Sequence, residues 1–246
     1  MPDLAIELNN VSVCYLHNKR GIYSIKDFVT KGGLFSPFDK KVILNNINLK
    51  INKGECVGIV GRNGEGKSTL LRTIAGIITP SEGTCKVNIE MSPLLTLGAG
   101  LELELSGIEN IKIYTALSGN YDKNKINELI DSVASFSELS LGQLKQPTKM
   151  YSTGMLARLA FSSVVISQPQ LMMIDEVLAV GDKGFQDKCK KRIIEIKNAG
   201  ATILFVSHNA DEILELCERS ICIEKGRISV DGKSEEVMKH YLNLFN

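Results

Sequence analysis

One stretch of nine residues, 61–69, constrains this chain more than any other. It fits the pattern G-x-x-x-x-G-K-[ST], a loop that wraps the phosphates of a nucleoside triphosphate. The apolar run 56–60 before it has the length of a buried strand, and a helix-like segment starts after it at Leu70. This order places a helix N-terminus, with about half a positive charge, under the phosphates. The sequence therefore predicts a nucleotide-binding α/β domain.

Each type of residue in the loop has its own expected role. Glycines at three positions let backbone N–H groups turn toward phosphate oxygens, the lysine is expected to reach the β- and γ-phosphates, and the serine hydroxyl is expected to ligate Mg²⁺. A glycine-rich turn with a chance Lys-Ser is the alternative, and the flanking strand and helix argue against it. The residues expected at the nucleotide are Gly61, Arg62, Asn63, Gly64, Glu65, Gly66, Lys67, Ser68 and Thr69.

Two carboxylates follow a second apolar run. Residues 171–174 read as a short buried strand that ends in Asp175 and Glu176. Because the carboxyl ends of parallel strands face the ligand crevice, Asp175 is expected near the loop as a Mg²⁺ ligand. Glu176 is expected to polarise the water that attacks the γ-phosphate. An acidic helix start after a strand is the alternative.

Two further segments are candidate phosphate contacts. Ser152, Thr153 and Gly154 begin a predicted helix that runs to 165. Ser152 is either a simple N-cap or, with the glycine amide and the helix end, part of a second anion site. His208 follows the apolar strand 201–206 and is expected to face the phosphates. A lone histidine is otherwise an ordinary surface or core residue.

Strands that alternate with helices predict an α/β fold with a mostly parallel, doubly wound sheet. The alternating runs 4–15 and 42–51 predict an antiparallel β-part at the N-terminus, and the stretch between them, 17–41, is a basic, Gly/Pro-punctuated insertion. We expect one domain over residues 1–246, with a core of 1–90 and 168–232. A helical subdomain is expected at about 91–167, and a C-terminal helix at 233–246.

Composition excludes several classes. The net charge of +1, from 29 basic and 28 acidic residues, gives no overall attraction to nucleic acid or anionic lipid. The six cysteines form no C-x-x-C pair, which predicts reduced thiols in a cytosolic protein and neither a disulfide framework nor a zinc site. We find no signal peptide and no apolar run of the ~20 residues that span a bilayer. A membrane pore would therefore come from another chain.

The order of these motifs resembles the ATP-binding cassette family over nearly the whole chain. The resemblance implies a P-loop ATPase that forms a head-to-tail dimer, with two ATP molecules between the 61–69 loop of one copy and Ser152–Gly154 of the other. It also implies that Tyr15 stacks on adenine, where base stacking contributes on the order of 1–3 kcal/mol. Asp182 would lie where the two subunits cross.

Further matches narrow the resemblance. The segments 151–155 and 174–182, and the 17–41 insertion, are similar to bacterial polysaccharide exporters of the O-antigen, capsule and teichoic-acid group. This implies an ATPase subunit at the cytoplasmic face of the bacterial inner membrane, bound to an integral membrane permease that exports a lipid-linked, O-antigen-like polysaccharide. The insertion is expected to face the permease or the glycan, or to be a solvated loop. A teichoic-acid or capsule exporter and a small-solute importer are the alternatives.

The chain also departs from the family. Thr153 and Met155 stand where most members have Gly and Gln, and the usual glutamine before the helical subdomain is replaced near Thr96 or Leu97. Cassette ATPases that act on ribosomes or DNA carry paired cassettes or long coiled coils, which do not fit in 246 residues. A GTPase or kinase is disfavoured by the Ser152–Gly154 motif and by the lack of N-K-x-D.

Overall fold

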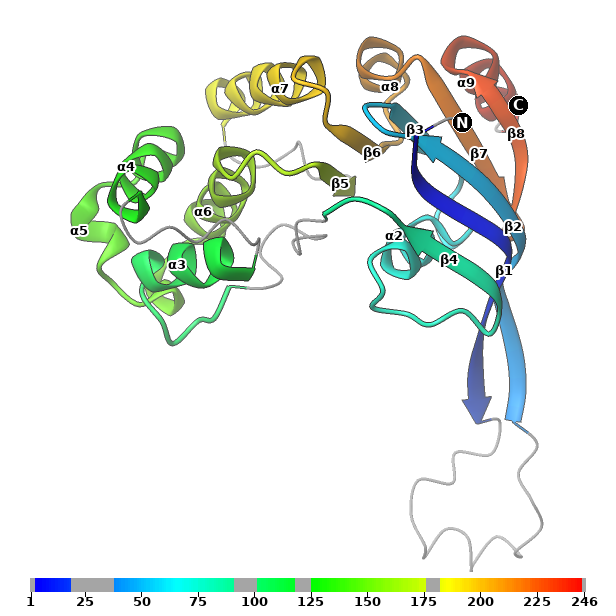
Figure 1. Ribbon diagram of the computed structural model, residues 1–246, viewed down its shortest axis with the longest axis horizontal. Coiled ribbons are helices and arrows are strands. Elements are labelled where there is room, and N and C mark those ends of the chain that lie inside the picture. Colours follow the sequence, from blue (N-terminus) through cyan, green and yellow to red (C-terminus); the bar gives the residue numbers. More distant parts are fainter. Residues whose placement is uncertain (1–2, 19–37, 91–100, 118–124, 176–181, 245–246) are drawn as a thin grey trace, which may run out of the picture.

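A computed structural model of the chain describes residues 3–18, 38–90, 101–117, 125–175 and 182–244 (Figure 1). Its strands are β1 (Leu4–Asn18), β2 (Phe38–Asn52), β3 (Cys56–Val60), β4 (Glu82–Val87), β5 (Leu171–Asp175), β6 (Thr202–Val206), β7 (Arg219–Glu224) and β8 (Arg227–Lys233). Its helices are α2 (Lys67–Ile74), α3 (Gly107–Leu117), α4 (Ile126–Ser137), α5 (Leu141–Leu144), a 3₁₀ turn at Thr148–Met150, α6 (Thr153–Ile166), α7 (Lys183–Asn198), α8 (Ala210–Leu216) and α9 (Ser234–Asn243).

The described strands form two sheets. The smaller sheet has the order β2-β1-β4, and both of its pairings are antiparallel. The larger sheet has the order β5-β6-β3-β7-β8, in which β7–β8 is antiparallel and the other pairs are parallel. The predicted fold class, a mostly parallel sheet with an antiparallel N-terminal part, is confirmed.

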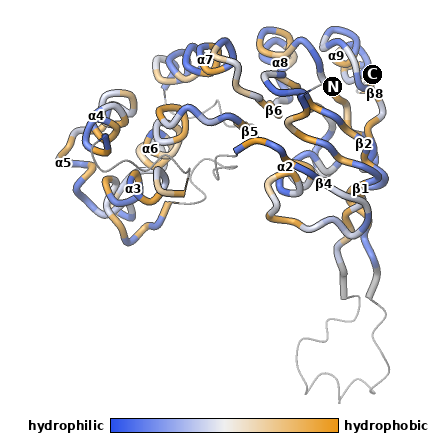
Figure 2. Tube along the Cα trace, viewed as in Figure 1, coloured by the Kyte–Doolittle hydropathy of each residue, from blue (hydrophilic) through white to orange (hydrophobic). Residues whose placement is uncertain are grey.

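The parallel strands β5, β6, β3 and β7 are buried on both faces of the larger sheet, as expected for parallel strands. The antiparallel edge strand β8 is partly exposed. Alternate residues of each strand point to opposite sides, so Val57 and Ile59 join a core with α2 and the small sheet. Cys56 and Val60 join a second core with α7, α8 and α9. Figure 2 shows apolar and polar residues alternating along these helices, as required of helices that cover one face of a sheet. Because both faces of the parallel strands are covered, a ligand can reach these strands only at the edge where they end.

A third core lies among α3, α4, α5 and α6, in the lobe of helices that Figure 1 places away from the small sheet. It includes the fully buried Ile111, Val133 and Leu159. The boundaries of the expected subdomain, about 91–167, remain a prediction, since 91–100 lie outside the described residues. The short helix α5 was not predicted; a capping box between Ser140 and Gln143 begins it.

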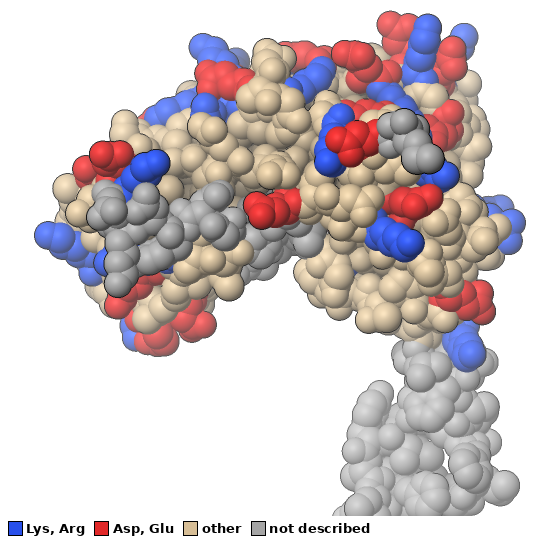
Figure 3. All heavy atoms as spheres, in the orientation of Figure 1, with Lys and Arg blue, Asp and Glu red and all other residues tan. Residues whose placement is uncertain are grey.

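The surface agrees with the balanced composition. Figure 3 shows acidic and basic side chains interspersed along the rim made by α7, α8 and α9. Within the described ranges, every helix is too short or too polar to cross a bilayer. All six cysteines are free thiols.

Candidate nucleotide-binding site

The phosphate loop joins the end of β3 to α2. Gly66 is the N-cap of α2 and has φ 106°, in the left-handed region that L side chains rarely adopt. This glycine turns the chain directly into the helix, so α2 begins at Lys67, three residues before the start expected at Leu70. The amides of the loop and the helix N-terminus therefore lie together, as an anion site requires.

The loop rests on the end of β7. A Cβ built on Gly61 would lie 2.4 Å from the carbonyl oxygen of Ile223, so only glycine fits against that strand. The carboxylate of Glu65 accepts a hydrogen bond from the backbone N–H of Lys225. The position of the loop thus depends on the β7–β8 turn.

The ammonium of Lys67 lies over the loop. Its Nζ donates to the carbonyl oxygen of Gly61 at 2.6 Å and to that of Arg62 at 3.2 Å. The side chains of Arg62 and Asn63 are exposed, as is Gly64. A cation held by loop carbonyls can bind an anion that arrives at the same loop.

Ser68 and Asp175 meet across the site. The hydroxyl of Ser68 donates to Oδ2 of Asp175 at 2.8 Å, although 107 residues separate them in the chain. Neighbouring oxygen ligands in a Mg²⁺ octahedron are about 3 Å apart, and hydroxyl and carboxylate oxygens are ligands this ion accepts. The donor set and its spacing therefore fit Mg²⁺.

His208 follows the strand that is paired with the Asp175 strand. Val206 at the end of β6 is in register with Asp175 on one side and with Ile59 on the other. His208 follows two residues later and is exposed. Ser207 between them donates its hydroxyl to Glu212 at 2.7 Å, which fixes the chain as it leaves the strand.

The Ser152–Gly154 segment begins α6, in the lobe of helices and away from α2 of the same chain (Figure 1). Ser152 is the N-cap, and its hydroxyl accepts the N–H of Met155 at 3.2 Å. Ser152 and Thr153 are exposed. The structure therefore does not bring this segment to the loop of its own chain.

Asp182 is the N-cap of α7, where its Oδ1 accepts the N–H of Phe185 at 3.0 Å. This backbone hydrogen bond, with a smaller contribution from the guanidinium of Arg158, lowers the pKa of Asp182. Arg158 was missed by sequence reasoning, since its partners lie 20 and 24 residues away and no short motif marks it.

Of the remaining predicted residues, some lie within the part of the chain that the structure describes and others lie outside it. Tyr15 on β1 is 43% exposed and is paired with Lys41 of β2. The Asp-Glu pair is described only at Asp175, because Glu176 lies outside the described residues. The same holds for Thr96, Leu97 and most of the 17–41 insertion.

Comparison with known proteins places these features in one family. A family profile described as "ABC transporter" matches residues 44–179. The O-antigen export system ATP-binding protein RfbB of Klebsiella pneumoniae is 40% identical over 203 residues, which cover 82% of this chain and 81% of RfbB. The teichoic acids export ATP-binding protein TagH of Staphylococcus haemolyticus is 37% identical over 239 residues, 97% of this chain and 88% of TagH.

A solved structure supports the fold independently. The dimeric structure of a post-hydrolysis state of the ATP-binding cassette MJ0796, bound to ADP and Pi, matches with a TM-score of 0.75 at 19% identity. The match covers 93% of this chain and 98% of the other. With the profile match over more than half of its length, this chain belongs to the ABC transporter family and is an ATPase that hydrolyses ATP to drive transport.

Proposed function

We propose that the chain is the ATPase subunit of an exporter that moves a lipid-linked, O-antigen-like polysaccharide across the bacterial inner membrane. RfbB and TagH, the relatives named above, are ATP-binding proteins of O-antigen export and of teichoic acids export, respectively. This likeness favours an exporter over a small-solute importer. A teichoic-acid or capsule polymer is the second candidate, because TagH matches over more of this chain than RfbB does.

The contact between Ser68 and Asp175 carries the ATPase part of the proposal. These two residues would hold Mg²⁺, which when bound offsets negative charge on the phosphates. Lys67 would bind the β- and γ-phosphates as a point charge. Glu176, directly after Asp175, would take a proton from the attacking water, and His208 would hold the γ-phosphate from the neighbouring strand.

A second copy of the chain would complete the pocket. The start of α6 offers a hydroxyl, backbone N–H groups and a helix N-terminus, and it lies away from the phosphate loop of its own chain. We therefore infer a head-to-tail dimer in which Ser152–Gly154 of one copy face the ATP held by the 61–69 loop of the other. Asp182 would lie at the crossing between the copies.

A transport ATPase also needs a membrane partner and a transported substrate. The chain would bind an integral membrane permease at the cytoplasmic face of the inner membrane, with the 17–41 insertion toward the permease or the lipid-linked glycan. The net charge of +1 gives no overall attraction to nucleic acid, so we expect no nucleic acid partner. Shortening the insertion would then stop export and spare ATP hydrolysis.

Complementation in cells tests this function. A strain lacking the protein should regain surface glycan with the wild-type chain and not with Glu176→Gln, while lipid-linked glycan accumulates inside. Lys191→Ala, an exposed lysine on α7, is the control and should restore export. Purified Glu176→Gln with its permease should bind ATP and fail to hydrolyse it. Hydrolysis near the wild-type rate would refute the role of Glu176.

The glycan class needs its own measurement. Composition analysis of the accumulated lipid-linked material separates an O-antigen repeat unit from a polyol-phosphate polymer. Accumulation of a teichoic-acid precursor would replace the first candidate with the second, and unchanged surface glycan in the deletion strain would contradict both.

A further inference from the structure

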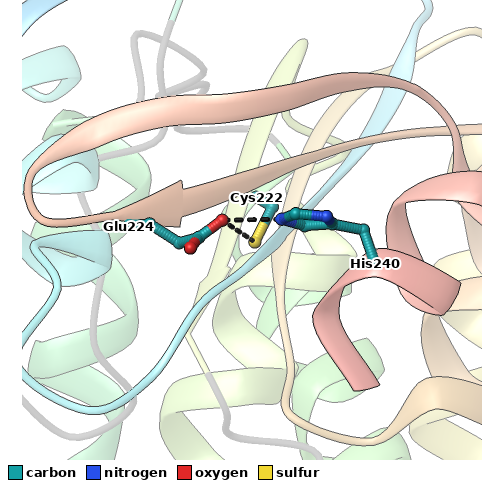
Figure 4. Close-up of side chains that lie close together, drawn as sticks. All are labelled: Cys222, Glu224 and His240. Carbon is teal, nitrogen blue, oxygen red and sulfur yellow. Dashed lines mark hydrogen bonds and ion pairs between the residues drawn. The ribbon is translucent and has the colours of Figure 1, made fainter. Parts of the chain in front are cut away.

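Three side chains with metal-binding chemistry meet beside α9, outside the nucleotide site (Figure 4). Cys222 and Glu224 lie two residues apart on β7, and His240 projects toward them from α9. Nε2 of His240 is 2.7 Å from Oε1 of Glu224, and Sγ of Cys222 is 3.9 Å from the same oxygen. In the described part of the chain these three ligand atoms all lie within 4.8 Å of one another.

We propose that Cys222, Glu224 and His240 bind a divalent transition-metal ion of the zinc class, with water as the fourth ligand. Thiolate, imidazole and carboxylate are the ligands that Zn²⁺ takes in proteins, whereas Mg²⁺ and Ca²⁺ take oxygen alone. Ligand atoms on a tetrahedral zinc lie about 3.3–3.8 Å apart, given bond lengths of about 2.0–2.3 Å. Entry of the ion therefore requires the His240–Glu224 contact to open by about 1 Å or less.

The burial of the three residues suits an ion that enters from one side. Cys222 is 0% exposed and forms the floor, whereas the side chains of Glu224 and His240 are 30% and 39% exposed. Solvent can thus reach the open coordination position. Binding displaces the thiol proton into solvent, after which thiolate and carboxylate together balance the charge of the dication.

A β-bulge shapes the strand at this point. Cys222 is paired with Val230 and Ile223 with Ile228, which leaves Ser229 as the extra residue of β8. The Ser229 hydroxyl donates to the carbonyl oxygen of Cys222 at 3.2 Å. This bond fixes the backbone that carries the thiol.

The site lies next to the support of the phosphate loop. Between and after the two strand ligands, the Ile223 carbonyl abuts Gly61 and the Lys225 N–H bonds Glu65. A metal ion would therefore fasten α9 to the same end of β7 that holds the loop. The C-terminal helix and the nucleotide site would be coupled through four residues of one strand and turn.

The rival explanation is an acid–base pair that anchors α9 without metal. To separate the two, the full chain is stripped with a chelator and titrated with CoCl₂ in the absence of nucleotide and Mg²⁺. We expect one equivalent of Co²⁺, a thiolate-to-cobalt charge-transfer band, and displacement of Co²⁺ by Zn²⁺. Cys222→Ser should lose the band, and His240→Gln, which keeps a hydrogen-bonding side chain, should bind Co²⁺ roughly tenfold or more weakly.

Cys85→Ser is the matched control, since Cys85 is a half-buried thiol on β4 outside the cluster. It should keep the band, and Zn²⁺ should raise the Tm of this control and of the wild type but not that of His240→Gln. Absence of stoichiometric binding in the wild type would overturn the proposal. So would a band that survives Cys222→Ser and disappears in Cys217→Ser, which would assign the ion to Cys56 and Cys217, whose sulfurs are 3.4 Å apart.

Discussion

Arg158 on α6 bonds Asp182 at the start of α7, with 2.5 Å between Nη2 and Oδ2. Its other terminal nitrogen, Nη1, lies 2.6 Å from Oε2 of Glu138, the C-cap of α4. The guanidinium also lies over the Phe185 ring, 4.7 Å from its centroid. Only 17% of the Arg158 side chain is exposed, whereas the side chains of Glu138 and Asp182 are 51% and 68% exposed. Arg158 thus joins three helices from a shielded position, and its two carboxylate partners face solvent.

Arg158→Ala should lower the free energy of unfolding by about 1–3 kcal/mol, because it removes both ion pairs and the stacking on Phe185. Arg158→Lys should be intermediate, since one ammonium cannot reproduce the two ends of the guanidinium fork. Urea unfolding measures both variants. Arg72→Ala, an exposed arginine on α2, is the control and should change stability by about 0.5 kcal/mol or less. A lysine variant equal to wild type would show that the double bridge adds nothing.

Glu138 makes stability depend on pH. Its hydrogen bond from Arg158 lowers its pKa below the ordinary value of 4.5. The contribution to stability is therefore complete above the unfolded pKa and declines as pH falls through the lower folded value. We expect wild-type stability to fall more steeply than that of Glu138→Gln from about pH 5 to about pH 3, in urea unfolding at each pH. Glu128→Gln, an exposed residue of α4, should keep the wild-type slope.

Most of the architecture could be predicted because it depends on local patterns. The run 56–60 and the motif after it predict β3 and its loop without knowledge of any distant contact. The predicted start of α2 was wrong by three residues. Lys67 and Ser68 give no apolar periodicity, and the N-cap is Gly66, which is in a left-handed conformation and has no capping side chain to mark the helix start. The helix α5, with four residues, is too short to produce a periodic signal.

The residues of the candidate site were likewise predictable only where a local motif marks them. Lys67, Ser68 and Asp175 are marked by motifs, since the chemistry of phosphate and Mg²⁺ restricts the residues that can serve. Arg158 and the group around Cys222 carry no such mark, because their partners come together only through packing. The spacing of the cysteines predicted no zinc site, because it takes no account of histidines elsewhere in the chain. His240 lies on α9 and comes close to Cys222 of β7 only in the folded protein.

Gly66→Ala should disable the nucleotide site. At φ 106° a side chain strains the backbone by about 1–3 kcal/mol, and the added Cβ would lie 2.7 Å from Cδ2 of Leu44. We expect a lower Tm and loss of ATP binding in equilibrium dialysis. Gly142→Ala is the matched control: its Cβ would meet nothing closer than the Ser140 hydroxyl at 3.8 Å, and it lies within α5. That variant should bind ATP normally and should stabilise the fold by up to about 1 kcal/mol.

Tyr15 offers a test of where the base binds. Its ring is 43% exposed on β1, available for stacking, and stacking contributes about 1–3 kcal/mol per base. Tyr15→Ala should therefore raise the Kd for ATP by roughly 5- to 150-fold, and Tyr15→Phe should keep near wild-type affinity because the ring remains. Tripolyphosphate is the control ligand. It carries the phosphates without a base, so Tyr15→Ala should bind it as the wild type does. An equal loss for both ligands would mean that Tyr15 supports the loop and does not contact adenine.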